Sequence, residues 1–308
     1  MTLYVDTRFL DTEALAEITG NGRSVTLTDD PHEAEAVMVM TSFFKDHTPS
    51  SMPNLKWIQL LSAGFDGADL DAYAKKGVII TNAKDVYSVQ IAEDVFSKIL
   101  SMDRNIPTYA KQMDQGLWKR HRVDHEIMGS VCGIVGAGSI GREVAKRMKA
   151  FGATTIGLRR SQKSAPYIDT VVTGHEGFVT LLRQSDYVIV SVPLDDNTFH
   201  MFSGEAFSAM KPTSLLVNIA RGDVIDQDAL INALEEGRIR GAALDVTSPE
   251  PLPQDSPLWR MPNVLITPHA ASESPRQLAR LFDMVAANLK RYLLREPLHH
   301  TIDVTAIP

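Results

Sequence analysis

The sequence predicts an α/β protein with two doubly wound domains, in which helices cover both faces of parallel β-sheets. Short apolar runs alternate with segments of helical periodicity along the chain, and most of these runs lack the polar alternation of a half-exposed strand. The length of 308 residues also exceeds what a single hydrophobic core usually fills. Buried strands that alternate with helices are typical of the doubly wound class.

The expected strands are the short apolar runs that lie between turn-forming residues. Their continuous apolar character indicates burial on both faces of a sheet. The runs are Leu3–Val5, Val37–Met40, Trp57–Leu60, Val78–Thr81, Val131–Val135, Thr154–Leu158, Tyr187–Val192, Leu215–Ile219, Ala242–Val246 and Val264–Thr267.

Two long helices are expected, one on each side of the central part of the chain. The first begins near Ser88. The second begins with Ser274 as a cap, followed by proline at the first helical position and by Gln277 where a capping box requires it. The apolar stripes are Ile91, Val95, Phe96, Ile99 and Leu100 in the first helix, and Leu278, Leu281, Phe282, Val285 and Leu289 in the second. Both helices are expected to pack in a core and to form the crossings between domains.

Charge and cysteine content exclude several classes of protein. The net charge of −7, without a long basic run, argues against a dedicated nucleic-acid binder. No segment approaches the ~20 apolar residues of a membrane span, and the N-terminal segment lacks the pattern of a signal peptide. The single cysteine, Cys132, excludes an internal disulfide and lies in an apolar run. A buried, inert thiol and a cytoplasmic location are therefore expected, and no metal site is expected.

A glycine-rich loop follows the run Val131–Val135. It reads Gly136-Ala137-Gly138-Ser139-Ile140-Gly141, and a helical segment and a second strand come after it. In this strand–turn–helix–strand context the pattern indicates a dinucleotide site. Gly136 permits the tight turn, Gly138 lets the backbone approach a pyrophosphate, and Gly141 lets the helix pack closely. The helix N-terminus then offers N–H groups to the anion.

The residues after the second strand bear on the choice between NAD and NADP. An acidic residue there would accept hydrogen bonds from the ribose 2′-hydroxyl. This chain has Arg159, Arg160 and Ser161 instead, with Lys163 nearby. Guanidinium groups suit a 2′-phosphate because their donors form a planar fork. NADP(H) is therefore favoured. The alternative is that the arginines are solvated surface charges and that NAD(H) is also used.

Three polar residues follow three neighbouring strands of the predicted sheet. Arg221 comes after Leu215–Ile219, Glu250 after Ala242–Val246, and His269 after Val264–Thr267. Ligands of open parallel sheets bind outside the carboxyl ends of the strands. Each residue alone is more often a surface or packing residue. Together they fit the reduction of a 2-keto acid, because an arginine grips a carboxylate, a histidine gives a proton near neutral pH, and a glutamate orients the imidazole.

With these residues and the glycine-rich loop, the chain resembles the D-isomer-specific 2-hydroxyacid dehydrogenases. The resemblance covers about residues 55–290, and the separations of 29 and 19 residues between Arg221, Glu250 and His269 match that family's catalytic set. The segment Thr247–Pro253 looks most like the glyoxylate/hydroxypyruvate reductase branch. The segments that carry the resemblance are Gly136–Gly141, Val217–Asp223, Gly241–Leu252 and Asn263–His269.

The resemblance implies a domain layout, a substrate loop and a dimer. A Rossmann-type cofactor domain (99–286) is inserted in a flavodoxin-like substrate domain (1–98 and 287–308). Ala63 and Gly64, in the loop Ser62–Asp66, bind the substrate carboxylate through backbone N–H groups, and Trp118 lies at a homodimer face or serves packing only. The cofactor groove is implied to include Gly136, Gly138, Ser139, Ile140, Gly141, Arg159, Arg160, Ser161, Pro193, Ala220, Arg221, Asp245 and His269.

Two departures from the family pattern lie near the expected cofactor or substrate. The usual His-x-Pro-Leu-Thr reads Ser191–Asp195 here, and the usual asparagine after a Gly-Val pair is replaced around Asp85–Ser88. Both concern the identity of the substrate more than the type of reaction, so the expected substrate is a small 2-keto acid resembling glyoxylate or hydroxypyruvate.

Two other functions fit the same scaffold. A formate-type dehydrogenase needs no proton donor and carries glutamine at the position of Glu250. A corepressor-type sensor would bind NAD(P)H without turnover, and the complete set of arginine, glutamate and histidine argues against a purely binding role. Fold alone does not decide between these functions.

Overall fold

The computed structural model describes residues 1–11, 13, 15, 25–65 and 68–302. The chain divides into two compact units: Met1–Tyr87 with Ser274–Pro308, and Ser88–Glu273. These divisions fall at 87/88 and 273/274, whereas the boundaries expected from the sequence are 98/99 and 286/287. Each difference amounts to most of one helix. At the first crossing, α3 (Ser88–Asp103) belongs to the second unit because it packs along α5 (Ser139–Ala150).

The sheet of the first unit is wholly parallel and has the strand order β2-β1-β3-β4-β5 within the described residues. Numbered along the chain, this is the order 2-1-3-4-5 of flavodoxin-like folds, which confirms the predicted fold class. The strands are β1 (Thr2–Val5), β2 (Thr26–Leu27), β3 (Ala36–Val39), β4 (Trp57–Leu60) and β5 (Ile79–Thr81).

Both faces of this sheet are covered by apolar side chains. Along β4, Trp57 belongs to the cluster that includes Leu289 of α9 (Gln277–Leu293), and Ile58 belongs to the opposite cluster with Tyr73 of α2 (Asp71–Ala74). Burial on both faces explains why the strands read as continuous apolar runs. The described 3₁₀ segments are η1 (Pro31–Glu33) and η2 (Thr41–Lys45).

The start of α9 differs from the prediction. The helix begins at Gln277, and Ser274 forms a turn before it, in which the Ser274 Oγ accepts the Arg276 N–H at 3.2 Å. The predicted capping box was therefore wrong. The Ser274 side chain accepts an N–H group of the turn before α9 and does not cap the first N–H groups of the helix. Leu278 is exposed, so the buried stripe begins at Leu281.

The sheet of the second unit is also parallel, with the order β12-β11-β10-β9-β6-β7-β8. Counted from β6, this is the Rossmann order 3-2-1-4-5-6 with one further strand, which confirms the predicted class. The strands are β6 (Val131–Val135), β7 (Thr154–Leu158), β8 (Thr170–Val172), β9 (Tyr187–Val190), β10 (Leu215–Asn218), β11 (Gly241–Leu244) and β12 (Val264–Ile266).

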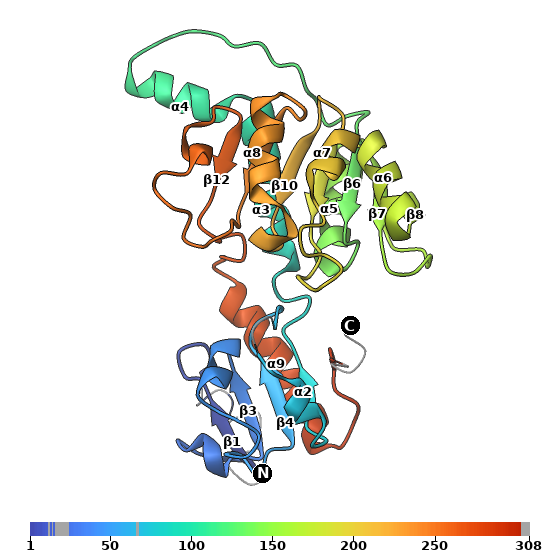
Figure 1. The fold of residues 1–308 in the computed structure, drawn as a ribbon. Helices are drawn as coiled ribbons and strands as arrows, with labels where there is room; N and C mark the ends of the chain where they lie inside the picture. The colour runs from blue at the N-terminus through green and yellow to red at the C-terminus, as the bar shows by residue number, and fades with distance from the viewer. Residues whose placement is uncertain (12, 14, 16–24, 66–67, 303–308) are drawn as a thin grey trace. The chain divides into compact units, whose positions relative to one another are not determined.

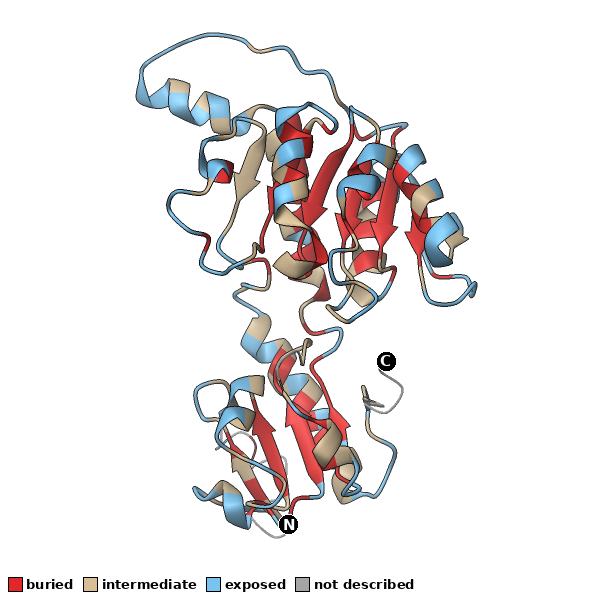
Figure 2. Ribbon diagram, in the orientation of Figure 1, coloured by how far each residue is buried: buried red, intermediate tan, exposed pale blue. Residues whose placement is uncertain are grey.

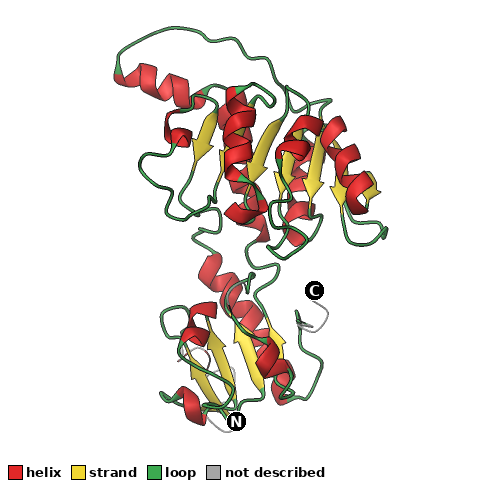
Figure 3. Ribbon diagram, in the orientation of Figure 1, coloured by secondary structure: helices red, strands yellow, loops and turns green. Residues whose placement is uncertain are grey.

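Helices cover both faces of this sheet, and its central strands are buried while β12 is less so (Figure 1, Figure 2, Figure 3). Leu100, predicted on the buried stripe of α3, is partly exposed. The remaining helices are α4 (Ile106–Asp114), α6 (Gly174–Gln184), α7 (Gly204–Ala209) and α8 (Gln227–Glu235), with 3₁₀ segments η3 (Gly222–Val224) and η4 (Pro257–Arg260). In the described part of the chain, no helix has the length and apolar character required to span a membrane.

The sequence missed two strands and extended several others too far. The short strands β2 and β8 lie at sheet edges and contain no fully buried residue, so they leave no apolar run to detect. The predicted strands that run to Val192, Ile219, Val246 and Thr267 end two, one, two and one residues earlier. At these points the chain leaves the sheet for the loops of the candidate site.

Candidate active site

The loop after β6 has the geometry of a tight turn into a helix. Gly136 has φ +99°, and a Cβ there would lie 2.6 Å from the Ser191 carbonyl oxygen. A Cβ at Gly141 would lie 2.5 Å from the Gly136 oxygen, so the close packing of helix on loop needs a glycine at this position. Gly138 precedes the first residue of α5, and a Cβ there would meet nothing within 4 Å. Open space therefore adjoins the helix N-terminus, where an anion is favoured.

A cavity of about 780 Å³ opens beside this loop. Its walls come from the loop after β6, the end of β7, the loop after β9 and the start of α6, which include Gly136, Gly138, Arg160 and Pro193. The cavity lies where β6 and β9 are neighbours, which is the point at which strand order reverses and doubly wound folds bind their ligands. The members of the predicted cofactor set that are not among its lining residues are Ser139, Ile140, Gly141, Ser161, Ala220, Arg221, Asp245 and His269.

The two arginines after β7 both line this cavity, and each has partners in the chain. Arg159 Nη1 donates to the carbonyl oxygens of Lys163 at 2.9 Å and Ser164 at 3.2 Å, which closes the turn that follows β7. Arg160 Nη2 donates to Asp195 Oδ2 at 2.7 Å. The sequence did not predict this pair, although Asp195 was noted where the family pattern has threonine.

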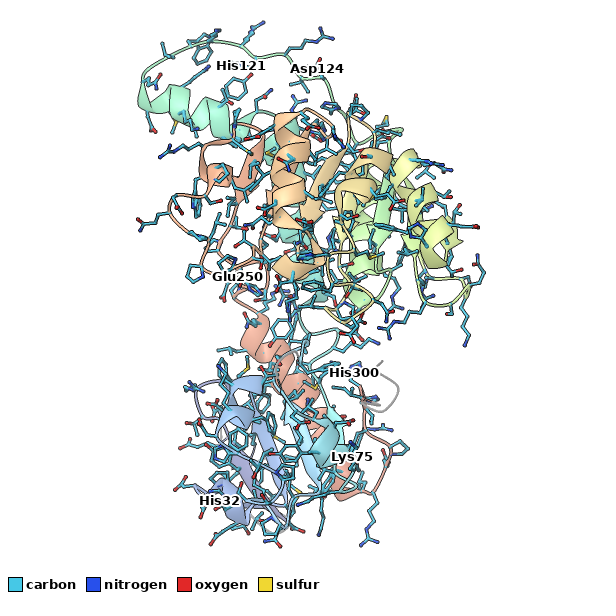
Figure 4. All side chains as sticks on the ribbon, viewed as in Figure 1. His32, Lys75, His121, Asp124, Glu250 and His300 are labelled. Carbon is cyan, nitrogen blue, oxygen red and sulfur yellow. The ribbon has the colours of Figure 1, made fainter. Side chains whose placement is uncertain are left out.

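His269 and Glu250 are brought together at the carboxyl edge of the sheet. The Nδ1 atom of His269 lies 2.9 Å from Glu250 Oε2, and Oε1 of the same carboxylate accepts the Thr247 N–H at 3.2 Å. Figure 4 labels Glu250, which lies at the end of the second unit toward which the strand arrows of Figure 1 point. The side chains of His269 and Glu250 are 50% and 39% exposed, so a ligand has access to both.

Arg221 lies in the loop after β10, directly before η3. The Asn218 side chain holds this loop, because Nδ2 donates to the Arg221 oxygen at 3.0 Å and Oδ1 accepts the Ala220 N–H at 3.0 Å. A Cβ at Gly222 would lie 2.0 Å from the Thr247 carbonyl oxygen. The absence of a side chain at Gly222 thus lets the arginine loop pack against the loop that carries Glu250.

Asp245 is buried and holds the turn that carries His269. Its Oδ1 accepts the Thr267 hydroxyl at 2.5 Å and the Ala270 N–H at 3.1 Å, and Oδ2 accepts the Ala271 N–H at 3.0 Å. The Asp245 backbone oxygen accepts the His269 N–H at 2.8 Å. His269 itself has φ +52°, a left-handed conformation that is uncommon for residues other than glycine and often marks functional sites.

The loop expected to bind the substrate carboxylate belongs to the first unit. The Ser62 hydroxyl donates to the Gly64 oxygen at 2.6 Å, and Asn82 Nδ2 donates to the Ala63 oxygen at 2.7 Å. These side chains fix the carbonyl groups of the loop. Asp66, the last residue of the predicted loop, lies outside the described residues.

Sequence reasoning missed the residues of α6 that line the cavity. His175 and Phe178 come from the first two turns of this helix, and Met201 comes from the segment before α7. Phe178 lies on the apolar face of α6, where a packing role and a lining role give the same pattern. The helix lies beside the glycine loop because of the order of the strands in space. That order cannot be read from a single sequence.

Comparisons with known proteins identify the family. The family model described as "D-isomer specific 2-hydroxyacid dehydrogenase, NAD binding domain" matches residues 96–271. A glyoxylate reductase of Korarchaeum cryptofilum is 34% identical over 270 residues, which cover 86% of this chain and 77% of the relative. A D-3-phosphoglycerate dehydrogenase of Methanocaldococcus jannaschii is 36% identical over 261 residues, or 82% of this chain, but the match spans 48% of that relative's length.

A solved structure agrees with this result. The D-isomer specific 2-hydroxyacid dehydrogenase of Xanthobacter autotrophicus Py2, in complex with NADPH and MES, has a TM-score of 0.79 and 28% identity, and 98% of each chain is covered. The chain therefore belongs to the D-isomer-specific 2-hydroxyacid dehydrogenases. It is a nicotinamide-dependent oxidoreductase of this family.

Proposed function

We propose that this protein reduces a small 2-keto acid of the glyoxylate or hydroxypyruvate kind to the D-2-hydroxy acid, with His269 as the proton donor. The contact of 2.9 Å between His269 Nδ1 and Glu250 Oε2 carries this proposal. With Nδ1 directed at the carboxylate, Nε2 is the ring atom that can give a proton to substrate. Glu250 keeps the ring oriented and stabilises its charged form, as an opposite charge does.

Arg221 is proposed to bind the carboxylate and to polarise the ketone of the substrate. A guanidinium group offers two parallel donors to a carboxylate, and its charge stabilises the oxyanion that develops as the ketone is reduced. Ala63 and Gly64 are proposed to donate their backbone N–H groups to the same carboxylate. The hydrogen bonds from Ser62 and Asn82 support this role, because they fix the peptide planes of the loop.

The residues of the second unit fit a dinucleotide. The open backbone at Gly138, the N-terminus of α5 and the adjoining cavity would hold its phosphates and adenosine, and Pro193 lines the same cavity. Ser139, Ile140, Ser161, Ala220 and Asp245 remain proposed members of the cofactor groove. When bound, the nicotinamide supplies the hydride.

NADP(H) is the preferred cofactor in this proposal, with NAD(H) as a second. Arg160, on the wall of the cavity, has a side chain that is 69% exposed, and it is proposed to bind the 2′-phosphate. The NADPH complex of the Xanthobacter relative supports the use of this cofactor in the family. Because Asp195 already occupies one nitrogen of Arg160, we expect the preference to be moderate.

The test is a set of initial rates with glyoxylate, hydroxypyruvate, pyruvate and phenylpyruvate, each with NADPH and with NADH. The variant His269→Asn keeps a residue that tolerates φ +52°, and His200→Asn is its control because His200 has φ +49° and is exposed. His269→Asn should lower kcat at least about 100-fold while NADPH binding, followed by fluorescence, is retained. Binding of NADPH without turnover of any acid by the unmodified protein would instead favour a sensor.

A homodimer in the cytoplasm is also part of the proposal. Helix α4 and the segment after it, on which Figure 4 labels His121 and Asp124, expose Met113 by 77%, Leu117 by 54% and Trp118 by 98%. Clustered exposed apolar side chains mark interaction surfaces. Light scattering of Trp118→Ala should show a shift toward monomer, and an unchanged dimer would leave Trp118 without this role.

A further inference from the structure

Lys98 is a buried cation behind the candidate site. It lies on α3 between the buried residues Val95 and Ile99, and its side chain is only 1% exposed. Lysine is among the residues that are almost never fully buried unless they are paired. A buried ammonium group loses its hydration, so its partners have to compensate for that loss.

Two carboxylates surround the Lys98 ammonium group. Asp94, one turn earlier on the same helix, forms a short ion pair with it, and Asp245 Oδ1 lies 3.5 Å from Nζ. The side chain of Asp245 is only 2% exposed, whereas that of Asp94 is 22% exposed. Burial raises the pKa of Asp94, and the hydrogen bond to Lys98 opposes this rise only in part. The fully buried partner of the lysine is therefore Asp245.

The two oxygens of the Asp245 side chain act as hydrogen-bond acceptors for the turn that carries His269. Three donors from residues 267–271 point at its two oxygens. An ionised carboxylate only accepts hydrogen bonds, whereas a protonated one must place an O–H group in the same crowded space. A low-dielectric interior disfavours the charged form, and a nearby cation favours it. Lys98 is the cation that the described structure places beside Asp245.

We propose that Lys98 is a positioning residue for proton transfer: its ammonium group pairs with the buried Asp245 carboxylate and holds it in place, and Asp245 fixes the turn from which His269 projects. The turn is anchored on both sides of His269, at Thr267 and at Ala270 and Ala271. The left-handed backbone of His269 makes this anchoring necessary, because an uncommon conformation persists only where its surroundings hold it. This role rests on the proposed function of His269.

The experiment compares Lys98→Met with Asp94→Asn in the full-length protein. Methionine keeps the length of the apolar stem without the charge, and because it leaves the buried Asp245 carboxylate without its cation, this variant is expected to be less stable than the wild type. Asp94→Asn removes the other partner of Lys98 and leaves Asp245 unchanged. Lys98→Gln, which keeps a donor but no charge, serves if the methionine variant does not fold.

Two readouts are taken on each variant: hydrogen exchange of the amides of residues 267–271 without substrate, and kcat and KM for the keto acid. Lys98→Met should exchange these amides faster and lower kcat by about 10- to 100-fold, with KM changed much less. Asp94→Asn should keep kcat within about threefold, because a partly exposed ion pair contributes little. A lysine that served stability alone would lower the melting temperature and leave kcat of the folded protein unchanged.

The two readouts also separate this inference from the proposed function. Wild-type exchange and wild-type kcat in Lys98→Met would overturn the inference and leave the role of His269 intact. Faster exchange with unchanged kcat would overturn the catalytic consequence, and His269→Asn would then show whether His269 acts at all. Equal losses of kcat in Lys98→Met and Asp94→Asn would also overturn the link to Asp245.

Discussion

Arg160 and Asp195 form an ion pair of 2.7 Å that joins two walls of the cofactor cavity. The side chain of Asp195 is only 7% exposed, and its Oδ1 accepts the N–H groups of Asn197 and Thr198 at 3.0 and 3.1 Å. The carboxylate is thus fixed, and the arginine is the exposed partner. In the proposed site, a 2′-phosphate on Arg160 would meet this carboxylate nearby, so we expect Asp195 to weaken the attraction of the site for NADPH.

Removing the charge of Asp195 should therefore strengthen the preference for NADPH. Asp195→Asn should lower KM for NADPH by about two- to fivefold, the range of an exposed ion pair, and leave KM for NADH nearly unchanged. Steady-state rates with both cofactors measure this ratio. Asp196→Asn, at the exposed neighbouring position, controls for a change in overall charge. A fall in NADPH affinity in Asp195→Asn would mean that the carboxylate orients Arg160 for the phosphate.

The side chain of Arg160 should discriminate between the two cofactors. Arg160→Gln should raise KM for NADPH about tenfold, because a charge-assisted bond to a phosphate is lost, and should leave KM for NADH within about twofold. Arg183→Gln removes an exposed arginine of α6 as a matched control. Equal effects on both cofactors would place Arg160 outside the phosphate site and would favour the alternative of a solvated surface charge.

The partner of the proposed proton donor should affect chemistry more than binding. Glu250→Gln keeps the shape of the side chain but removes the charge that faces His269 Nδ1. We expect kcat to fall by about 10- to 100-fold, less than in His269→Asn, and NADPH affinity to stay within about twofold. Glu273→Gln, an exposed carboxylate, is the control. Unchanged kcat would show that the 2.9 Å contact has no role in the reaction.

The sequence predicted the fold well because its signals are local. Apolar runs gave the described strands of both sheets except β2 and β8, and the glycines of 136–141 predicted the turn whose φ of +99° at Gly136 only glycine adopts readily. The meeting of Glu250 and His269 was predicted from strand order at one edge. The pairs Arg160–Asp195 and Lys98–Asp245 were not predicted, because the two residues of each pair are 35 and 147 residues apart and lie on different elements.

The packing of the arginine loop on the glutamate loop gives the last prediction. A Cβ at Gly222 would lie 2.0 Å from the Thr247 oxygen and 2.7 Å from the Ser248 nitrogen, so the backbone of one loop has to move. Gly222→Ala should lower stability by about 1–3 kcal/mol, as overpacking does, and should also lower kcat/KM, because Arg221 and Glu250 lie in the two loops that separate. Thermal unfolding and steady-state rates measure the two effects.

Gly204→Ala is the matched control for this prediction. Gly204 begins α7, and a Cβ there would meet nothing within 4 Å. Alanine is also the better helix former, so this variant should keep its activity and its stability should be equal or slightly higher. If Gly222→Ala behaves like Gly204→Ala in both measurements, the two loops tolerate separation, and their contact does not set the geometry of Arg221 and Glu250.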